Sequence, residues 1–294
     1  MSKTADMTVW AQDPFSDDII PRSFRIFRKP DLKRVNSRDI FVLTSVPDLP
    51  VVTEFVRAAN HRNHLRTLFV REDDNAQFLP QMLYVAKLRM TRNILVHSDK
   101  DVPKRVLTAW SLGCPDQLIA TAQVIDDELF VMACDHTLFR VGFEEMPALK
   151  RIPEEQRSSF TLSSEGSYIH WPEADVHIDL DAVRYLKDDV WREKKDQERL
   201  MYDIRFGEAV AAFRKQCGLR QADIQGISER HVRRIEKGGR TKVDTLRVLA
   251  RSHGLSLKAY LDKIAEILSE DGEVISRVST SIPQDTIDLS GEQI

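Results

Sequence analysis

The chain has 294 residues, 42% of them hydrophobic and 30% charged, and a formal net charge of −3. This length predicts roughly two or three compact domains, and the nearly neutral charge favours no class of partner by itself. No apolar run approaches the roughly 20 residues of a membrane helix. The N-terminus also lacks the apolar core of a secretory signal, because it carries Asp6, Asp13, Asp17 and Asp18. We therefore expect a cytoplasmic protein without a membrane partner.

The chain contains an odd number of widely separated cysteines, Cys114, Cys134 and Cys217. Their spacing matches neither a disulfide scaffold nor a CxxC pair, which indicates a reducing compartment. A free cysteine packs well as a small apolar residue, so we expect each thiol to be buried and none to be a metal ligand or a nucleophile.

Residues 1–38 are polar, carry scattered prolines and show no sustained periodicity, so we expect a flexible arm. Residues 39–115 then alternate short apolar runs with helical patterns. The predicted strands are Phe41–Val46, Leu68–Val70 and Ile94–Val96, and the helices follow at 48–59, 78–90 and 102–112. Three strand–helix units in series predict an α/β unit with a small parallel sheet covered by helices.

Residues 116–181 form a β-rich unit in our interpretation. Short β-branched or aromatic runs are separated by acidic turns, which predicts a meander of hairpins with strands at 117–124, 128–134 and 137–143. A further hairpin is expected from Phe160–Leu162 and Tyr168–Trp171. Residues 182–203 are highly charged and read as a solvated linker helix, and the polar residues 269–294 as a flexible tail.

Residues 204–268 are predicted to be an all-α domain, and they are strongly basic. Positions 205–260 carry 13 Lys and Arg against 5 Asp and Glu, a local charge of +8 within an acidic chain. This distribution is the electrostatic footprint of a nucleic-acid-binding module. Five short helices are expected, at Phe206–Cys217, Gln221–Gln225, Glu229–Lys237, Thr241–Ser252 and Leu257–Ile267.

The third of these helices has the pattern of a DNA-reading element. Ser228 is a candidate N-cap, and Val232 and Ile235 are spaced to face the core. A helix fits the major groove, where Arg can donate two parallel hydrogen bonds to guanine while flanking cations neutralise phosphates. The side chains left exposed are Glu229, Arg230, Arg233, Arg234 and Lys237, with His231 near the helix start and Arg240 just beyond the helix.

The same segment contains the sequences Cys217–Ile224, Gly226–Ser228 and Val232–Gly238, followed by Thr245-Leu246 and Leu249-Ala250. Together they resemble the lambda-repressor-like, xenobiotic-response-element type of helix-turn-helix. The resemblance implies DNA contacts from Gln221, Glu229, Arg230, His231, Arg233 and Arg234, and a structural role for Glu236. The interval between Gln221 and Ser228 is shorter than in that family, which predicts a truncated second helix.

A second, weaker resemblance lies in the β-rich unit. The sequence Gly166–Pro172, followed by Asp175–Asp179, is similar to a small domain family of unknown function that can precede helix-turn-helix segments. This resemblance implies a fold unit and no activity.

Two further sets of polar residues are candidate sites. Asp175, His177 and Asp179 alternate on a predicted strand with His170 nearby, which suits a metal, but any half-buried strand shows this pattern and we predict no metal. The carboxyl ends of the parallel strands would gather Ser45, Glu72, Asp73, His97, Ser98 and Asp99, a place for an effector or an active site. No phosphate-binding glycine loop accompanies them, so we predict neither an enzyme nor a cofactor.

These observations predict a multidomain α+β protein that acts as a sequence-specific transcriptional regulator, with double-stranded DNA as its partner. We expect a homodimer, because one such module buries too little surface for a long specific site. The N-terminal units are expected to receive a small effector or a protein partner. The alternative is an antitoxin-like or scaffold protein that uses DNA binding for self-regulation.

Overall fold

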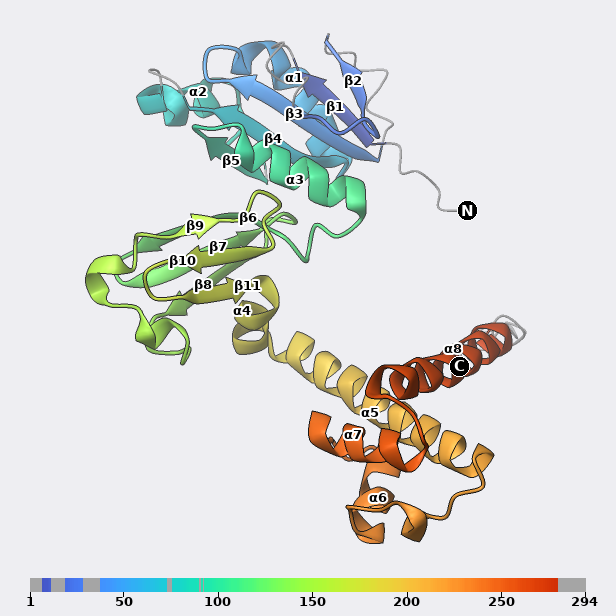
Figure 1. Ribbon diagram of the computed structural model, residues 1–294. Coiled ribbons are helices and arrows are strands. Elements are labelled where there is room, and N and C mark those ends of the chain that lie inside the picture. Colours follow the sequence, from blue (N-terminus) through green and yellow to red (C-terminus); the bar gives the residue numbers. More distant parts are fainter. Residues whose placement is uncertain are drawn as a thin grey trace, which may run out of the picture. The chain divides into compact units, whose positions relative to one another are not determined.

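The computed structural model describes residues 7–11, 19–28, 38–72, 76–89, 91 and 93–279 (Figure 1). The chain divides into two compact units, residues 1–189 and 190–294. The first unit contains a parallel sheet followed by antiparallel sheets, and the second is helical. None of the helices within the described residues is long and apolar enough to cross a membrane.

The first unit begins with a five-stranded parallel sheet in the order β2-β1-β3-β4-β5, which confirms the predicted parallel sheet. Side chains on alternate positions of β3 enter different cores: Ile40 and Val42 pack beneath α1 and α2, whereas Phe41 packs beneath α3. The elements are β1 (Met7–Ala11), β2 (Arg25–Phe27), β3 (Asp39–Ser45), β4 (Leu65–Arg71) and β5 (Ile94–His97), with α1 (Leu49–His61), α2 (Leu79–Val85) and α3 (Asp101–Leu112).

The expectation of a flexible arm over residues 1–38 is wrong for two segments. β1 pairs in parallel with β3, and its residues Met7–Ala11 are all buried. β2 pairs in turn with β1. A run of five residues is too short to show a period, and its partner lies about thirty residues away, so only the long-range pairing makes it a strand.

The second predicted helix of this unit is shorter than expected. A 3₁₀ turn, Ala76–Phe78, precedes α2, and the helix ends at Val85. Lys87 follows with a positive φ of 53°, a backbone conformation that cannot continue a right-handed helix. Met90, at the predicted helix end, lies outside the described residues.

Residues 119–187 form two three-stranded antiparallel sheets, which confirms the predicted hairpins. The sheets share one core, in which Leu129 and Val131 of the first pack with Ile169 and Trp171 of the second. Their strands are β6 (Ile119–Ile125), β7 (Glu128–Ala133) and β8 (Leu138–Gly142), then β9 (Thr161–Leu162), β10 (Tyr168–Trp171) and β11 (Val176–Asp179), followed by α4 (Leu180–Lys187).

The parallel sheet and the antiparallel sheets of this unit are joined by buried and part-buried hydrogen bonds. Arg105 of α3 donates its Nε–H to the carbonyl of Ala120, at 2.9 Å, and the Trp110 indole donates to the carbonyl of Cys134, at 3.1 Å. The hydroxyl of Thr67 lies 2.8 Å from Nε2 of His136. These bonds connect β4 and α3 to β6 and to the turn between β7 and β8.

The cysteines differ in burial, which corrects the expectation that all three are buried. Cys134 is fully buried and Cys114 is half-buried, whereas Cys217 is exposed at the end of a helix. Burial raises the pKa of Cys134 to about 12, so its thiol is protonated at neutral pH.

The second unit consists of α5 (Asp189–Gln216), α6 (Glu229–Glu236), α7 (Val243–Ser252) and α8 (Leu257–Ser279). Val210, Val232, Leu249 and Tyr260 bring all four helices to one core. The predicted linker helix, 182–203, is divided at Asp188, which is extended: its first residues belong to α4, and the rest continue without a break through the predicted first helix as α5. α8 likewise continues to Ser279, past the predicted end at Ile267 and into the predicted flexible tail.

Candidate nucleic-acid interface

The helix α6 has a defined start and a two-sided pattern. The hydroxyl of Ser228 accepts a hydrogen bond from the backbone N–H of His231, at 3.3 Å, and so caps the helix. Val232 and Ile235 are buried in the core of the helical unit, as expected. The opposite side of α6 is therefore fixed toward solvent.

The predicted DNA-contacting side chains on α6 lie on this solvent side. Among the described residues, Arg230 and Lys237 form no ion pair and are exposed. Arg233 donates to the carboxylate of Glu229, at 3.0 Å, and an Arg234 Nη2 lies 3.1 Å from Nε2 of His231. Exposed pairs of this kind contribute about 1 kcal/mol or less, so an anionic ligand can replace them.

The truncated second helix is confirmed as a single 3₁₀ turn, Gln221–Asp223. Gln221 is half-buried, and its amide Nε2 donates a hydrogen bond to the carboxylate of Glu236. Its Oε1 accepts a long bond from Nε of Arg233, at 3.5 Å. The turn is thus connected to the C-terminal half of α6 by side chains.

An ion pair beneath α6 joins that helix to α5. Nε of Arg214 donates to Oε1 of Glu236, at 2.6 Å, and Nη2 donates to Oε2, at 3.1 Å. Both side chains are only 8% exposed, and Nη1 of Arg214 also donates to the carbonyl of Leu219, at 2.6 Å. The sequence pattern did not identify Arg214 as part of a buried ion pair. Its role becomes visible only when the fold brings Glu236 to it.

The end of α6 packs directly against α5 at a glycine. A Cβ on Gly207 would lie 2.5 Å from the carbonyl oxygen of Ile235 and 2.7 Å from the amide nitrogen of Gly238. Gly238 has a φ of +85°, which L side chains rarely adopt. The close approach of the two backbones therefore fixes where α6 sits on α5.

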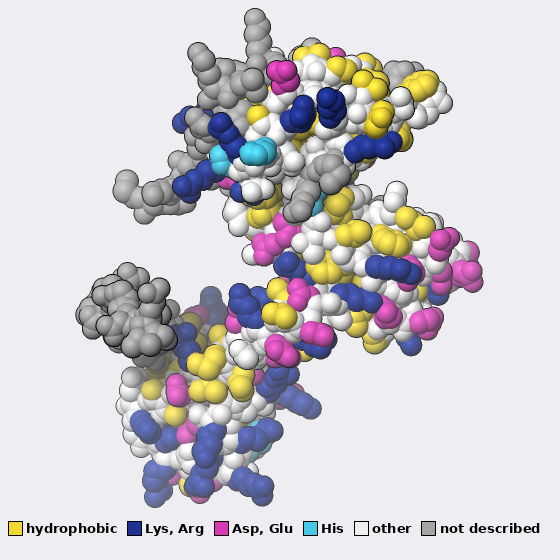
Figure 2. Space-filling view, turned by 180° about the vertical axis from the view of Figure 1, so that it is seen from behind, with side chains coloured by type: hydrophobic (Ala, Val, Ile, Leu, Met, Phe, Trp, Pro, Cys, Tyr) yellow, Lys and Arg dark blue, Asp and Glu magenta, His cyan; other side chains and the backbone are white. Residues whose placement is uncertain are grey.

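Arg240 lies beyond α6, in the loop before α7. Its Nε is 3.4 Å from Oδ2 of Asp203 on α5, so an acidic partner already neutralises part of its charge. Figure 2 shows Lys and Arg side chains over the end of the helical unit where α6 lies in Figure 1. The structure thus places seven of the eight predicted DNA-contacting residues on α6, beside it or in the turn before it, and Arg240 apart.

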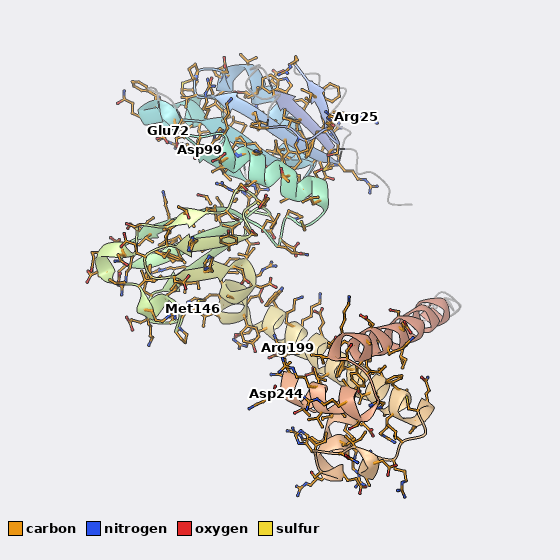
Figure 3. All side chains as sticks on the ribbon, viewed as in Figure 1. Arg25, Glu72, Asp99, Met146, Arg199 and Asp244 are labelled. Atoms are coloured by element: carbon orange, nitrogen blue, oxygen red, sulfur yellow. The ribbon has the colours of Figure 1, made fainter. Side chains whose placement is uncertain are left out.

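Three of the residues predicted at the carboxyl ends of β3, β4 and β5 form hydrogen bonds within their own loops: Ser45, His97 and Asp99. Ser45 donates to Asp48, at 2.8 Å, and Oδ1 of Asp99 accepts the backbone N–H of Asp101, at 2.8 Å (Figure 3). Nδ1 of His97 lies 2.7 Å from the carbonyl of Asp99, and burial lowers the pKa of His97. Asp73 lies outside the described residues.

The structure brings three of the four candidate metal ligands together. His170 of β10 and His177 of β11 are cross-strand neighbours, and their rings stack with centroids 3.9 Å apart and planes 13° apart. Potential ligand atoms of these histidines and of Asp175 all lie within 4.8 Å of one another. Asp179 is separate, because its carboxylate accepts the backbone N–H of Ala182, at 2.7 Å, and caps α4.

Comparison with known proteins gives one match. Residues 119–189 match DUF2442, a family described as proteins of unknown function, over the two antiparallel sheets and α4. No curated protein and no solved structure matches the chain. The weaker of the two resemblances found in the sequence is thereby confirmed, and residues 119–189 are the part of this chain for which a family is identified.

Proposed function

We propose that this protein is a sequence-specific DNA-binding transcriptional regulator that places α6 in the major groove. The observation that carries the proposal is a short capped helix with a buried apolar side and an exposed cationic side. Arg230, Arg233 and Arg234 lie on that side, with Lys237 directly after the helix. A single carboxylate, that of Glu229, opposes them on the exposed surface of the helix.

The side-chain partners on α6 support different roles for its cations, some in contacts with bases and others in contacts with phosphates. Arg230 and Arg234 are four residues apart and so project from the same side of the helix. Neither pairs with a carboxylate within the described residues, which leaves both guanidinium groups able to donate to guanine O6 and N7. Lys237 and Arg240, at and beyond the helix end, suit phosphate contacts.

Gln221 supports the proposal from outside α6. The hydrogen bond to Glu236 fixes its side chain beside the C-terminal half of α6, where Arg233 also donates to its amide oxygen. In the helix-turn-helix family that this segment resembles, the residue at this position contacts the DNA backbone or a base. The 3₁₀ turn before α6 then stands where the second helix of a helix-turn-helix would be.

We infer that two copies act together, since one eight-residue helix reads only a few base pairs. A surface for pairing is available on α5, where Leu200, Met201 and Tyr202 are between 57% and 58% exposed. Exposed apolar side chains on a helix are available for contact with another chain. The same side chains are equally available to a different protein partner, as in the alternative of an antitoxin-like or scaffold protein, and pull-down of a stoichiometric partner would favour that alternative.

The test of DNA recognition is selection of bound fragments from genomic DNA by the full chain, followed by a salt titration on the best site. We expect a shared motif and an affinity that falls steeply with salt. Arg230→Ala and Arg234→Ala should each weaken specific binding by roughly 1 to 3 kcal/mol, whereas Lys263→Ala on α8 should not. Equal binding to every sequence, or unchanged specificity in both arginine variants, refutes base reading by α6.

A further inference from the structure

The sheet β9–β10–β11 has two chemically different faces. Ile169 and Trp171 of β10 and Val176 and Ile178 of β11 are buried in the shared core. Because side chains alternate along a strand, the residues between them point outward. His170 and His177 therefore both lie on the outer face, where His170 is half-buried and His177 exposed.

The strand register and the connecting turn bring a carboxylate to these two histidines. His170 is paired directly with His177 across the strands, and Trp171 with Val176. The turn between the strands closes with a hydrogen bond from the Asp175 amide to the carbonyl of Pro172, at 3.3 Å, and Asp175 has a φ of +48°. The carboxylate of Asp175 thereby lies at the same edge of the sheet as the imidazoles.

The donor atoms of this cluster are not used elsewhere in the described part of the chain. No side-chain hydrogen bond or ion pair engages the ring nitrogens of His170 and His177 or the carboxylate of Asp175 there, and the ring contacts are those between the two histidines and with Tyr168. The neighbouring carboxylate of Asp179 differs, because it caps α4. Local structure thus accounts for Asp179 and leaves the other three groups with free lone pairs.

Two imidazole nitrogens and one carboxylate oxygen select the class of ion. This donor set suits Zn²⁺, which binds nitrogen and oxygen ligands at about 2.0 to 2.2 Å in tetrahedral geometry. Ca²⁺ and Mg²⁺ require oxygen ligands, about six or more for Ca²⁺, and the cluster supplies one carboxylate. Three protein ligands around a tetrahedral ion leave one position for water or an external anion.

We propose that His170, Asp175 and His177 form a Zn²⁺ site with an open fourth position on the outer face of the β9–β10–β11 sheet. The lone pairs of two stacked imidazoles are parallel, so one ring turns out of the stack when the ion binds. Asp175 and His177 are exposed, and this rotation moves side chains through solvent without disturbing the core. The site lies within residues 119–189, so it belongs to the DUF2442 portion of the chain and not to the cationic helix.

The experiment titrates the full chain, freed of metal with a chelator, with Zn²⁺ by calorimetry and with Co²⁺ by visible absorption. We expect a site that binds one Zn²⁺ per chain and gives the intense absorption of tetrahedral Co²⁺. His177→Gln and Asp175→Asn should each weaken binding at that site by about tenfold or more, since changes merely behind a ligand already cost 10- to 100-fold. Asn tolerates the positive φ at position 175, so the second variant retains its turn.

The controls are matched substitutions outside the cluster, Glu173→Gln in the same turn and His61→Gln on α1, and both should bind Zn²⁺ as the unaltered chain does. Nuclear magnetic resonance of the histidine ring protons adds a readout of the stack, whose mutual ring-current shifts should disappear on Zn²⁺ binding. The proposal is overturned if the triple variant His170→Gln, Asp175→Asn, His177→Gln binds Zn²⁺ as tightly as the unaltered chain. It is equally overturned if the unaltered chain shows no Zn²⁺ binding.

Discussion

The buried ion pair between Arg214 and Glu236 gives the sharpest test of how α6 is held. Glu236→Gln keeps the shape of the side chain but removes the charge opposite a guanidinium that is only 8% exposed. Breaking a buried pair by removing one partner costs about 3 to 5 kcal/mol, because the remaining charge is left uncompensated away from water. The bond from Nη1 of Arg214 to the Leu219 carbonyl survives and Gln still accepts one hydrogen bond, so we expect the lower end, about 3 kcal/mol.

For a unit of this size, that loss corresponds to a fall in melting temperature of more than about 10 °C. The assay is hydrogen exchange by mass spectrometry on the full chain, which follows peptides from α5, α6 and α7 separately from the first unit. Glu229→Gln is the matched control, because it removes an exposed carboxylate paired with Arg233, and should cost less than about 1 kcal/mol. Equal protection in the two variants would show that the buried pair does not hold α6.

Three further outcomes follow from packing and titration. Gly207→Ala places a Cβ against the backbone of α6, so it should destabilise the helical unit by about 1 to 3 kcal/mol in urea denaturation, unlike Glu208→Ala on the exposed side of α5. Tyr260→Phe should leave stability unchanged or raise it by about 1 kcal/mol, because the buried hydroxyl has no hydrogen-bond partner among the described residues, and a clear loss would contradict this. Burial lowers the pKa of His136 from 6.5, so the unfolded chain binds the proton more tightly. The first unit should then lose stability as pH falls below about 6.5, with a smaller slope in His136→Asn.

The sequence of the C-terminal region was sufficient to predict the cationic helix α6. The local charge of +8, the Ser228 cap and the spacing of Val232 and Ile235 all depend on residues within one helical turn or on simple counts. Local signals of this kind survive folding, and the structure places α6 with its cap and its two buried residues as the sequence predicts. Sequence likewise sufficed for three strands of the parallel sheet, which are short apolar runs, and for the hairpins, whose β-branched or aromatic runs are separated by turns.

Tertiary structure decided the features that depend on partners far along the chain. β1 is a strand because β2 and β3 flank it, and five residues by themselves carry no period. Arg214 is paired because α6 brings Glu236 to it across 22 positions of sequence. His170 and His177 face each other, with Asp175 beside them, because the hairpin register aligns β10 with β11. A sequence states which groups are present, whereas the distance between groups on different strands or helices is fixed only when long-range packing sets the register.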